Sequence, residues 1–327
     1  MRKLIYGGFA FLFVSLVIAI VYFAFLKRDV SVEEYTLKAV KSVSSTPDTL
    51  IKFIVAVSDI EYDESQDKIY VSDFQAGCIA VFDSNLNFLY RVGRRGKGPG
   101  EFSYVGGIKK YKNFLYVLDA GKIQILKDDR YYAGSFRVPW FPGVEFDVDL
   151  DGNIIIGAYD SLLAVIDTTG KVLKMFGKKV EQKNEQETFL KNGVWPVVDE
   201  KRNIYAVFLS LPYIRKYSKN FDLLSEKRLK EEVRYGLKTI EEMEKKHPGV
   251  RATMVGGVYY RSPYLYVRYA SPESEPVIYV YDAETLELRK KLKLETGKHI
   301  NNFIVDKNNN IVGFDLKNGE LVKYVVK

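Results

Sequence analysis

The stretch that decides the fold reads Val57-Ser-Asp-Ile-Glu-Tyr-Asp63, then Lys68-Ile-Tyr-Val-Ser-Asp73, then Ile79-Ala-Val-Phe-Asp83. Each segment is short and rich in β-branched and aromatic residues, which fit a half-buried pleated surface. Polar residues separate the segments, as expected of turns. The stretch therefore predicts three consecutive strands joined by tight connections.

The same pattern recurs along the chain at irregular spacing. Later copies contain Phe114-Leu-Tyr-Val-Leu-Asp119, Leu163-Ala-Val-Ile-Asp167, Asn203-Ile-Tyr-Ala-Val207, Val277-Ile-Tyr-Val-Tyr-Asp282 and Asn310-Ile-Val-Gly-Phe314. Six units of short strands favour radial repetition, which leaves only short, protected sheet edges. The sequence predicts an all-β fold, a six-bladed β-propeller.

The two ends of the chain suggest how the ring closes. The last unit has three strand patterns before the chain stops, so one outer strand is missing. A strand candidate, Glu34-Tyr-Thr-Leu-Lys-Ala-Val40, precedes the first unit. We expect this N-terminal strand to complete the sixth blade.

A more specific motif follows the first unit. Gly93-Arg-Arg-Gly-Lys-Gly-Pro-Gly-Glu-Phe102 resembles the Gly-x-x-Gly-x-Gly-Pro-Gly-Glu-Phe signature of bacterial NHL-repeat-like six-bladed propellers, within the TolB-like propeller superfamily. The resemblance covers about residues 50–327 and is strongest around 57–126. It implies the fold but no particular activity, because propellers host many unrelated functions.

Residues Leu4 to Leu26 form an uncharged, almost wholly apolar run. Its 23 residues are long enough to span a hydrocarbon core of ~30 Å as a helix. We expect residues 1–28 to be an uncleaved membrane anchor and 29–327 to be the propeller; a long cleaved signal peptide is the alternative. Basic residues flank both ends of the run, so the charge rule leaves the orientation open. By analogy with exported propellers, the propeller is expected outside the cytoplasm.

Composition excludes several classes of function. The chain of 327 residues has 49 basic and 42 acidic residues. Four of the basic residues flank the apolar run, so the rest carries 45 against 42, which is no nucleic-acid footprint. A single cysteine, Cys78, excludes an internal disulfide, and two histidines, His247 and His299, exclude a multi-histidine zinc site.

The glycine-rich segment invites comparison with a phosphate-binding loop. Gly96-Lys-Gly-Pro lacks the Ser or Thr that follows the lysine in such loops, and strands are predicted on both sides. A shaped loop between blades, with Phe102 in the core, is the favoured interpretation. Arg94, Arg95 and Lys97 remain candidates to contact an anionic ligand from it.

In a propeller, the loops between blades open on one face. Here they hold further candidate binding residues, Trp140, Phe141 and Arg251. Exposed aromatics beside arginines are typical of recognition surfaces, although Trp140 and Phe141 equally fit a role in covering the core. Residues 229–247 predict an amphipathic helical insertion, because Leu229, Val233, Leu237 and Ile240 share one helix face. It is either a lid or partner-binding element, or an insertion packed on the rim.

Aligning the inner strands brings Asp59, Glu145 and Asn302 into one column near the axis. Their oxygens are candidate ligands for Ca²⁺. Similar six-bladed hydrolases of the gluconolactonase type hold a metal in this way. A polar channel without metal is the alternative.

These observations lead to one functional expectation and one rival. We expect a membrane-anchored, extracytoplasmic propeller that binds a protein, peptide or glycan, but no nucleic acid, through its inter-blade loops. The rival is a calcium-dependent hydrolase or lactonase using the axial column. A purely structural role in an envelope assembly, through the blade edges, is a third possibility.

Overall fold

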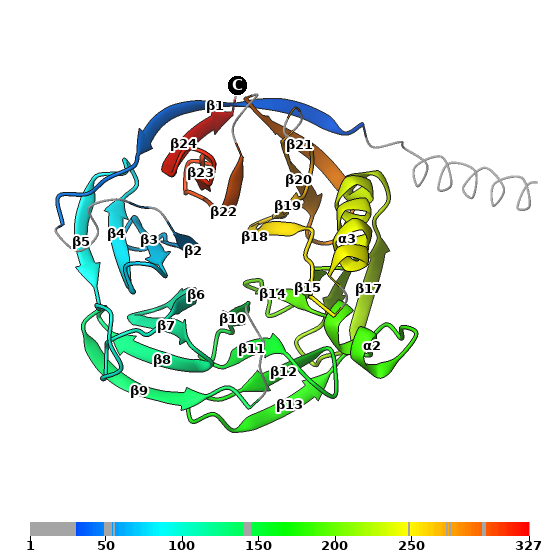
Figure 1. Ribbon diagram of the computed structural model, residues 1–327, viewed down its shortest axis with the longest axis horizontal. Coiled ribbons are helices and arrows are strands. Elements are labelled where there is room, and N and C mark those ends of the chain that lie inside the picture. The colour runs from blue at the N-terminus through cyan, green and yellow to red at the C-terminus, as the bar shows by residue number, and fades with distance from the viewer. Residues whose placement is uncertain are drawn as a thin grey trace, which may run out of the picture. The chain divides into compact units, whose positions relative to one another are not determined.

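Short antiparallel strands, from Glu33 onward, make up the framework of the described residues. The computed structural model describes residues 31–48, 54, 56–139, 145–247, 249–272, 274, 276–295 and 299–326. The strands lie in six blades around a central axis (Figure 1), which confirms the predicted six-bladed β-propeller.

Each blade is a four-stranded antiparallel sheet whose first strand is innermost. Blade 1 consists of β2(Val57–Asp63), β3(Lys68–Asp73), β4(Cys78–Asp83) and β5(Phe88–Val92). Blade 2 consists of β6(Val105–Tyr111), β7(Phe114–Asp119), β8(Lys122–Lys127) and β9(Tyr131–Arg137). Blade 3 consists of β10(Phe146–Val148), β11(Ile154–Gly157), β12(Leu163–Ile166) and β13(Val172–Phe176). Blade 4 consists of β14(Val194–Val198), β15(Ile204–Phe208), β16(Tyr213–Tyr217) and β17(Leu223–Arg228). Blade 5 consists of β18(Val255–Arg261), β19(Tyr264–Tyr269), β20(Val277–Asp282) and β21(Leu288–Leu294). Blade 6 consists of β22(Ile300–Val305), β23(Ile311–Asp315), β24(Glu320–Val326) and the N-terminal strand β1(Glu33–Val43).

The N-terminal strand closes the ring. β1 pairs antiparallel with β24, from Leu37 opposite Val326 to Val43 opposite Leu321. It also adjoins β21, so blades 5 and 6 share one eight-stranded sheet. Leu37 is fully buried in the cluster between these blades. The predicted closure by the N-terminal strand is therefore confirmed.

A short polar motif joins the first two strands in three blades. Asp149, Asp199 and Asp306 each accept hydrogen bonds from backbone N–H groups two and four residues later. An asparagine four residues on donates its side-chain amide to the same carboxylate. Such side-chain bonds mimic a backbone turn, and an aspartate directly follows the first strand in each of these three blades.

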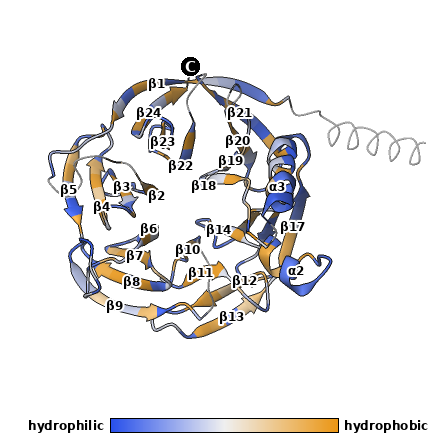
Figure 2. Cartoon of the chain, in the orientation of Figure 1, coloured by the Kyte–Doolittle hydropathy of each residue, from blue (hydrophilic) through white to orange (hydrophobic). Residues whose placement is uncertain are grey.

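Apolar side chains fill the spaces between blades. Among the described residues, buried apolar side chains form six clusters, each drawn mainly from two neighbouring blades. Figure 2 shows hydrophobic residues along the strands of every blade. Cys78 is fully buried in one of these clusters, as expected of a small hydrophobe.

In the part of the chain that the structure describes, two helical insertions interrupt the strands. The predicted insertion at 229–247 consists of a 3-10 turn, Glu231–Val233, and helix α3(Arg234–Lys246), with Val233 and Ile240 buried against blades 4 and 5. A second helix, α2(Glu185–Lys191), lies in the β13–β14 connection, where the sequence pattern does not predict a helix. No residue of α2 is buried, so its sequence carries no apolar stripe to indicate a helix.

The predicted membrane anchor, residues 4–26, lies outside the described residues. Within the described ranges, no helix has the length and apolarity needed to cross a membrane.

Candidate functional site

The connections that reach from the outer strand of one blade to the inner strand of the next lie on one face. The turns between the second and third strands of each blade lie there too, because strands alternate in direction. We call this the loop face; it carries segments 93–104, 177–193, 229–247 and 249–254, which include α2 and α3, both labelled in Figure 1.

The glycine-rich signature folds back on itself on the loop face. Arg94 pairs with Glu101 at 2.8 Å, and Glu101 also accepts the Gly98 N–H at 3.0 Å. Arg95 donates to the backbone carbonyls of Phe74 and Gln75 in the neighbouring turn. Arg94, Arg95 and Lys97 are all exposed, as a ligand contact requires, but the two arginines also hold their own loop together.

Close packing explains the glycines of this loop better than phosphate binding does. Gly93 has φ +71°, and a Cβ there would lie 2.2 Å from the buried ring of Phe102. Strands β5 and β6 flank the loop, so it lacks the helix that follows a phosphate-binding loop. The interpretation as a shaped inter-blade loop is thus favoured.

Two aromatic pairs stand on the loop face. Phe74 and Tyr104 lie 5.4 Å apart, and Tyr159 lies 5.0 Å from Phe189 of α2. Lys179 Nζ is 5.4 Å from both rings of the second pair. The sequence did not indicate these pairs, because each joins residues from separate segments. Trp140 and Phe141 lie outside the described residues.

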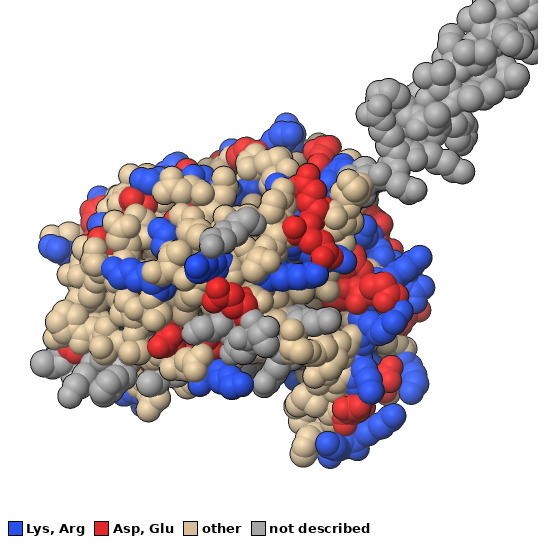
Figure 3. All heavy atoms as spheres, turned by 90° about the horizontal axis from the view of Figure 1, so that it is seen from above, with Lys and Arg blue, Asp and Glu red and all other residues tan. Residues whose placement is uncertain are grey.

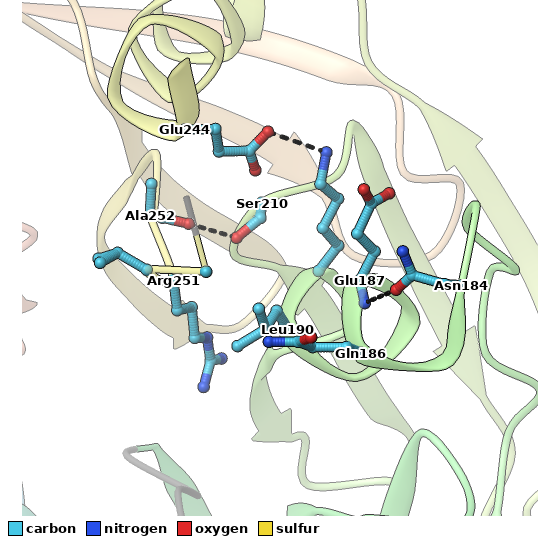
Figure 4. Close-up of a pocket in the computed structure, with 11 residues that line it drawn as sticks. Asn184, Gln186, Glu187, Leu190, Ser210, Glu244, Arg251 and Ala252 are labelled. Atoms are coloured by element: carbon cyan, nitrogen blue, oxygen red, sulfur yellow. Dashed lines mark hydrogen bonds and ion pairs between the residues drawn. The ribbon is translucent and has the colours of Figure 1, made fainter. Parts of the chain in front are cut away.

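A cavity of about 240 Å³ lies between α2, the end of α3 and segment 249–252. Its wall carries both charge signs (Figure 4): Glu187, Arg251, and Lys191, which pairs with Glu244 at 3.1 Å. Asn184 caps α2 by accepting the Glu187 N–H at 2.8 Å. We call this the α2–α3 pocket. Its acidic and basic side chains suit a ligand that carries both hydrogen-bond donors and acceptors.

Arg251, which sequence reasoning singled out, lines the α2–α3 pocket. Its side chain points away from the Lys191–Glu244 pair (Figure 4). A Cβ on Gly193 would lie 1.4 Å from Arg251 Nη2, so only glycine leaves room for this guanidinium. Burial lowers the pKa of Arg251, and the negative charge of Glu145 opposes that shift. Arg251 therefore links the pocket electrostatically to the axis.

The inner strands bring a charged cluster to the axis. Asp59 and Glu61 lie two residues apart in β2, and Glu145 and Asp147 lie two residues apart at the start of β10. Lys109 Nζ contacts Glu61 Oε2 at 3.0 Å. We call these five residues the axial cluster. Sequence reasoning missed Glu61, Lys109 and Asp147, although the two-residue period of a strand places them on the same face.

Burial shifts the ionisation of the axial cluster. It raises the pKa of Asp59, Glu145 and Asp147, and that of Glu61 to about 7. Burial alone lowers the pKa of Lys109, but Glu61, Asp59 and Asp147 raise it well above its usual value. Lys109 thus stays charged while the carboxylates compete for it.

Two of the three predicted metal ligands, Asp59 and Asn302, make hydrogen bonds within the chain. Asp59 accepts the N–H groups of Ile60 and Ile108 at 2.9 Å each. Asn302 donates its amide to the Ser58 carbonyl. Among the residues that the structure describes, no three His, Cys, Asp or Glu side chains are placed to hold a metal ion. The set of Asp59, Glu145 and Asn302 has only two carboxylates and stays a prediction.

The fold and the loop-face residues define a six-bladed β-propeller with a charged axis and a pocket at its rim. Residues 46–159 match the family DUF5128, described as a 6-bladed beta-propeller. No curated protein sequence matches the chain significantly.

Solved structures share the fold at low sequence identity. A Bacteroides fragilis protein described as exported is 14% identical with a TM-score of 0.60, covering 91% of this chain and 99% of its own. A catalytically inactive virginiamycin B lyase of Staphylococcus aureus, solved with quinupristin, is 10% identical with a TM-score of 0.55, covering 88% and 87%. The Pan2 WD40 domain of Neurospora crassa is also 10% identical, with a TM-score of 0.54, covering 88% and 94%. These likenesses concern the fold alone.

Proposed function

We propose that this chain is a membrane-anchored, extracytoplasmic binding propeller that holds a protein, peptide or glycan on its loop face. The observation that carries the proposal is the α2–α3 pocket, with Arg251 at its edge. Two insertions that the propeller core does not require, α2 and α3, build this pocket. Loops placed by a rigid scaffold are where binding residues concentrate.

The surroundings of the pocket support a recognition surface. Tyr159 packs against Phe189 of α2, and Val250 of the pocket wall is 53% exposed. Aromatic side chains next to charged groups are typical contacts of protein interfaces and of bound ligands. The pocket alone is small compared with the 300–1,000 Å³ or so of sites that enclose a small molecule. It therefore suits one side chain or sugar unit of a larger partner.

The proposed location rests on the N-terminal sequence. The apolar run at 4–26 has the length of a membrane span. The Bacteroides fragilis protein of the same fold is described as exported. We infer that the anchor holds the propeller at the outer side of a membrane. Protease treatment of intact cells would reach the propeller there, and protection of it would contradict this location.

Binding of the purified full chain to peptide and glycan arrays tests the proposal. The variant Arg251→Gln removes the charge at the edge of the pocket and is expected to weaken any specific binding at least tenfold, since a charged hydrogen bond contributes about 1.5–3 kcal/mol. Arg202→Gln is the matched control, because Arg202 pairs with Asp151 between turns on the opposite face. Equal loss in both variants, or no loss in either, would contradict a site at the loop face.

A further inference from the structure

Arg268, near the end of β19, is a buried arginine without a carboxylate. Its exposed fraction is 1%. Nη1 donates to the carbonyl of Tyr269, and Nη2 lies 3.2 Å from Nδ1 of His299. Nε has no hydrogen-bond partner. Among the described residues its hydrogen-bond partners are the Tyr269 carbonyl and His299, and neither is acidic, which is unusual because buried charges are normally paired.

The free donors of Arg268 lie on one edge of the guanidinium. Nε and Nη2 point in the same direction, and this edge is the fork that binds two oxygens of a carboxylate or phosphate in parallel. The bond of Nη1 to Tyr269 fixes the plane of the fork. His299 occupies only half of the edge, because it offers one ring nitrogen at a time. Burial also lowers the pKa of Arg268 to about 10, as expected where no anion offsets the loss of water.

The edge belongs to a polar site between blades 5 and 6. A Cβ on Gly256 would lie 2.8 Å from Asn301 Oδ1 and 3.4 Å from Arg268 Cγ, so these two side chains flank the same point. Asn301 and His299 are half-buried, near the start of β22, where the inner strand leaves the loop face. The amide of Asn301 supplies a further donor that rotation of the side chain can direct at an anion.

We propose that Arg268 and Asn301 form a binding site for one small oxyanion group, a carboxylate or a phosphate, which replaces His299 on the guanidinium fork. The group gains two charge-assisted hydrogen bonds, and the buried charge gains the counterion that the chain itself does not supply. This site goes beyond the proposed function, since it shares no residue with the α2–α3 pocket.

The test uses the full chain in non-ionic detergent, with thermal unfolding followed against added formate or inorganic phosphate at constant ionic strength. Binding to the folded state alone raises Tm with a saturable dependence on anion concentration. A response to formate alone identifies a carboxylate site, a response to phosphate alone identifies a phosphate site, and a response to both supports an oxyanion site in general.

Two variants assign the effect to this site. Arg268→Met is expected to abolish the anion response. The variant should still fold, because a buried site tolerates an apolar side chain better than an unpaired charge. His299→Ala removes the competing acceptor and is expected to lower the midpoint concentration roughly fivefold, the equivalent of one hydrogen bond. Arg202→Met, a change at an exposed arginine on the opposite face, is the control and should respond as the wild type. No rise in Tm with either anion, or an equal rise in Arg268→Met, would overturn the proposal.

Discussion

Lys109 Nζ lies 3.0 Å from Glu61 Oε2, a contact that joins the inner strands of blades 1 and 2 beside the axis. Both side chains are about seven-eighths buried. The negative charges of Asp59 and Asp147 also raise the pKa of Lys109, so this one cation interacts with three carboxylates. The axis is therefore a place where ionisation is coupled to folding.

Stability should fall as the pH rises from about 4.5 to 7. The pKa of Glu61 is about 7 in the folded chain against an ordinary value of 4.5, so the folded state holds a proton that the unfolded state has released. The stabilisation is present below 4.5 and is lost as the pH approaches 7. Glu61→Gln should reduce this fall by up to about 3 kcal/mol, measured by urea unfolding at several pH values. The exposed Glu64→Gln is the control; an unchanged slope in Glu61→Gln would contradict the account.

Closure of the ring by β1 should be needed for stability. Leu37 is fully buried between blades 5 and 6, whereas Val40 of the same strand is 54% exposed. Leu37→Ala should lower the free energy of unfolding by about 2–5 kcal/mol. Val40→Ala should change it by less than about 0.5 kcal/mol. Similar effects of the two changes in denaturant unfolding would show that β1 does not hold the ring closed.

Displacing Arg251 without removing it should impair binding. In Gly193→Ala the new methyl group would overlap Arg251 Nη2, so the guanidinium must leave its place. We expect array binding to weaken about as much as in Arg251→Gln, with little change in Tm. Gly157→Ala is the control, because no atom lies within 4 Å of the added Cβ. If Gly193→Ala bound as strongly as the wild type, binding would not depend on the position of the Arg251 guanidinium.

Metal content distinguishes the binding propeller from the hydrolase that the axial column suggested. Because both oxygens of Asp59 accept backbone N–H groups, we expect less than one Ca²⁺ per chain after dialysis, by elemental analysis. One Ca²⁺ per chain that disappears in an Asp59→Ala, Glu145→Ala double variant would instead favour the hydrolase.

The fold was readable from the sequence because its signals are local. Each strand pattern and the apolar stripe of α3 lie within one short segment. The last unit has only three strand patterns, which indicated that a strand from elsewhere, β1, completes it. The site was readable only in part. Arg251 was found by its place in a loop, but its fit against Gly193 and the pairing of Tyr159 with Phe189 join segments that only the folded ring brings together.

Site-specific photo-crosslinking in cells tests the central claim, binding at the loop face, most directly. A photoreactive residue replaces Val250 at the α2–α3 pocket or, as the control, Leu150 in the β10–β11 turn on the opposite face; both side chains are exposed. The account predicts a discrete crosslinked adduct from position 250 that Gly193→Ala diminishes, and none from position 150. An adduct from position 150 alone, or from neither position, would contradict it.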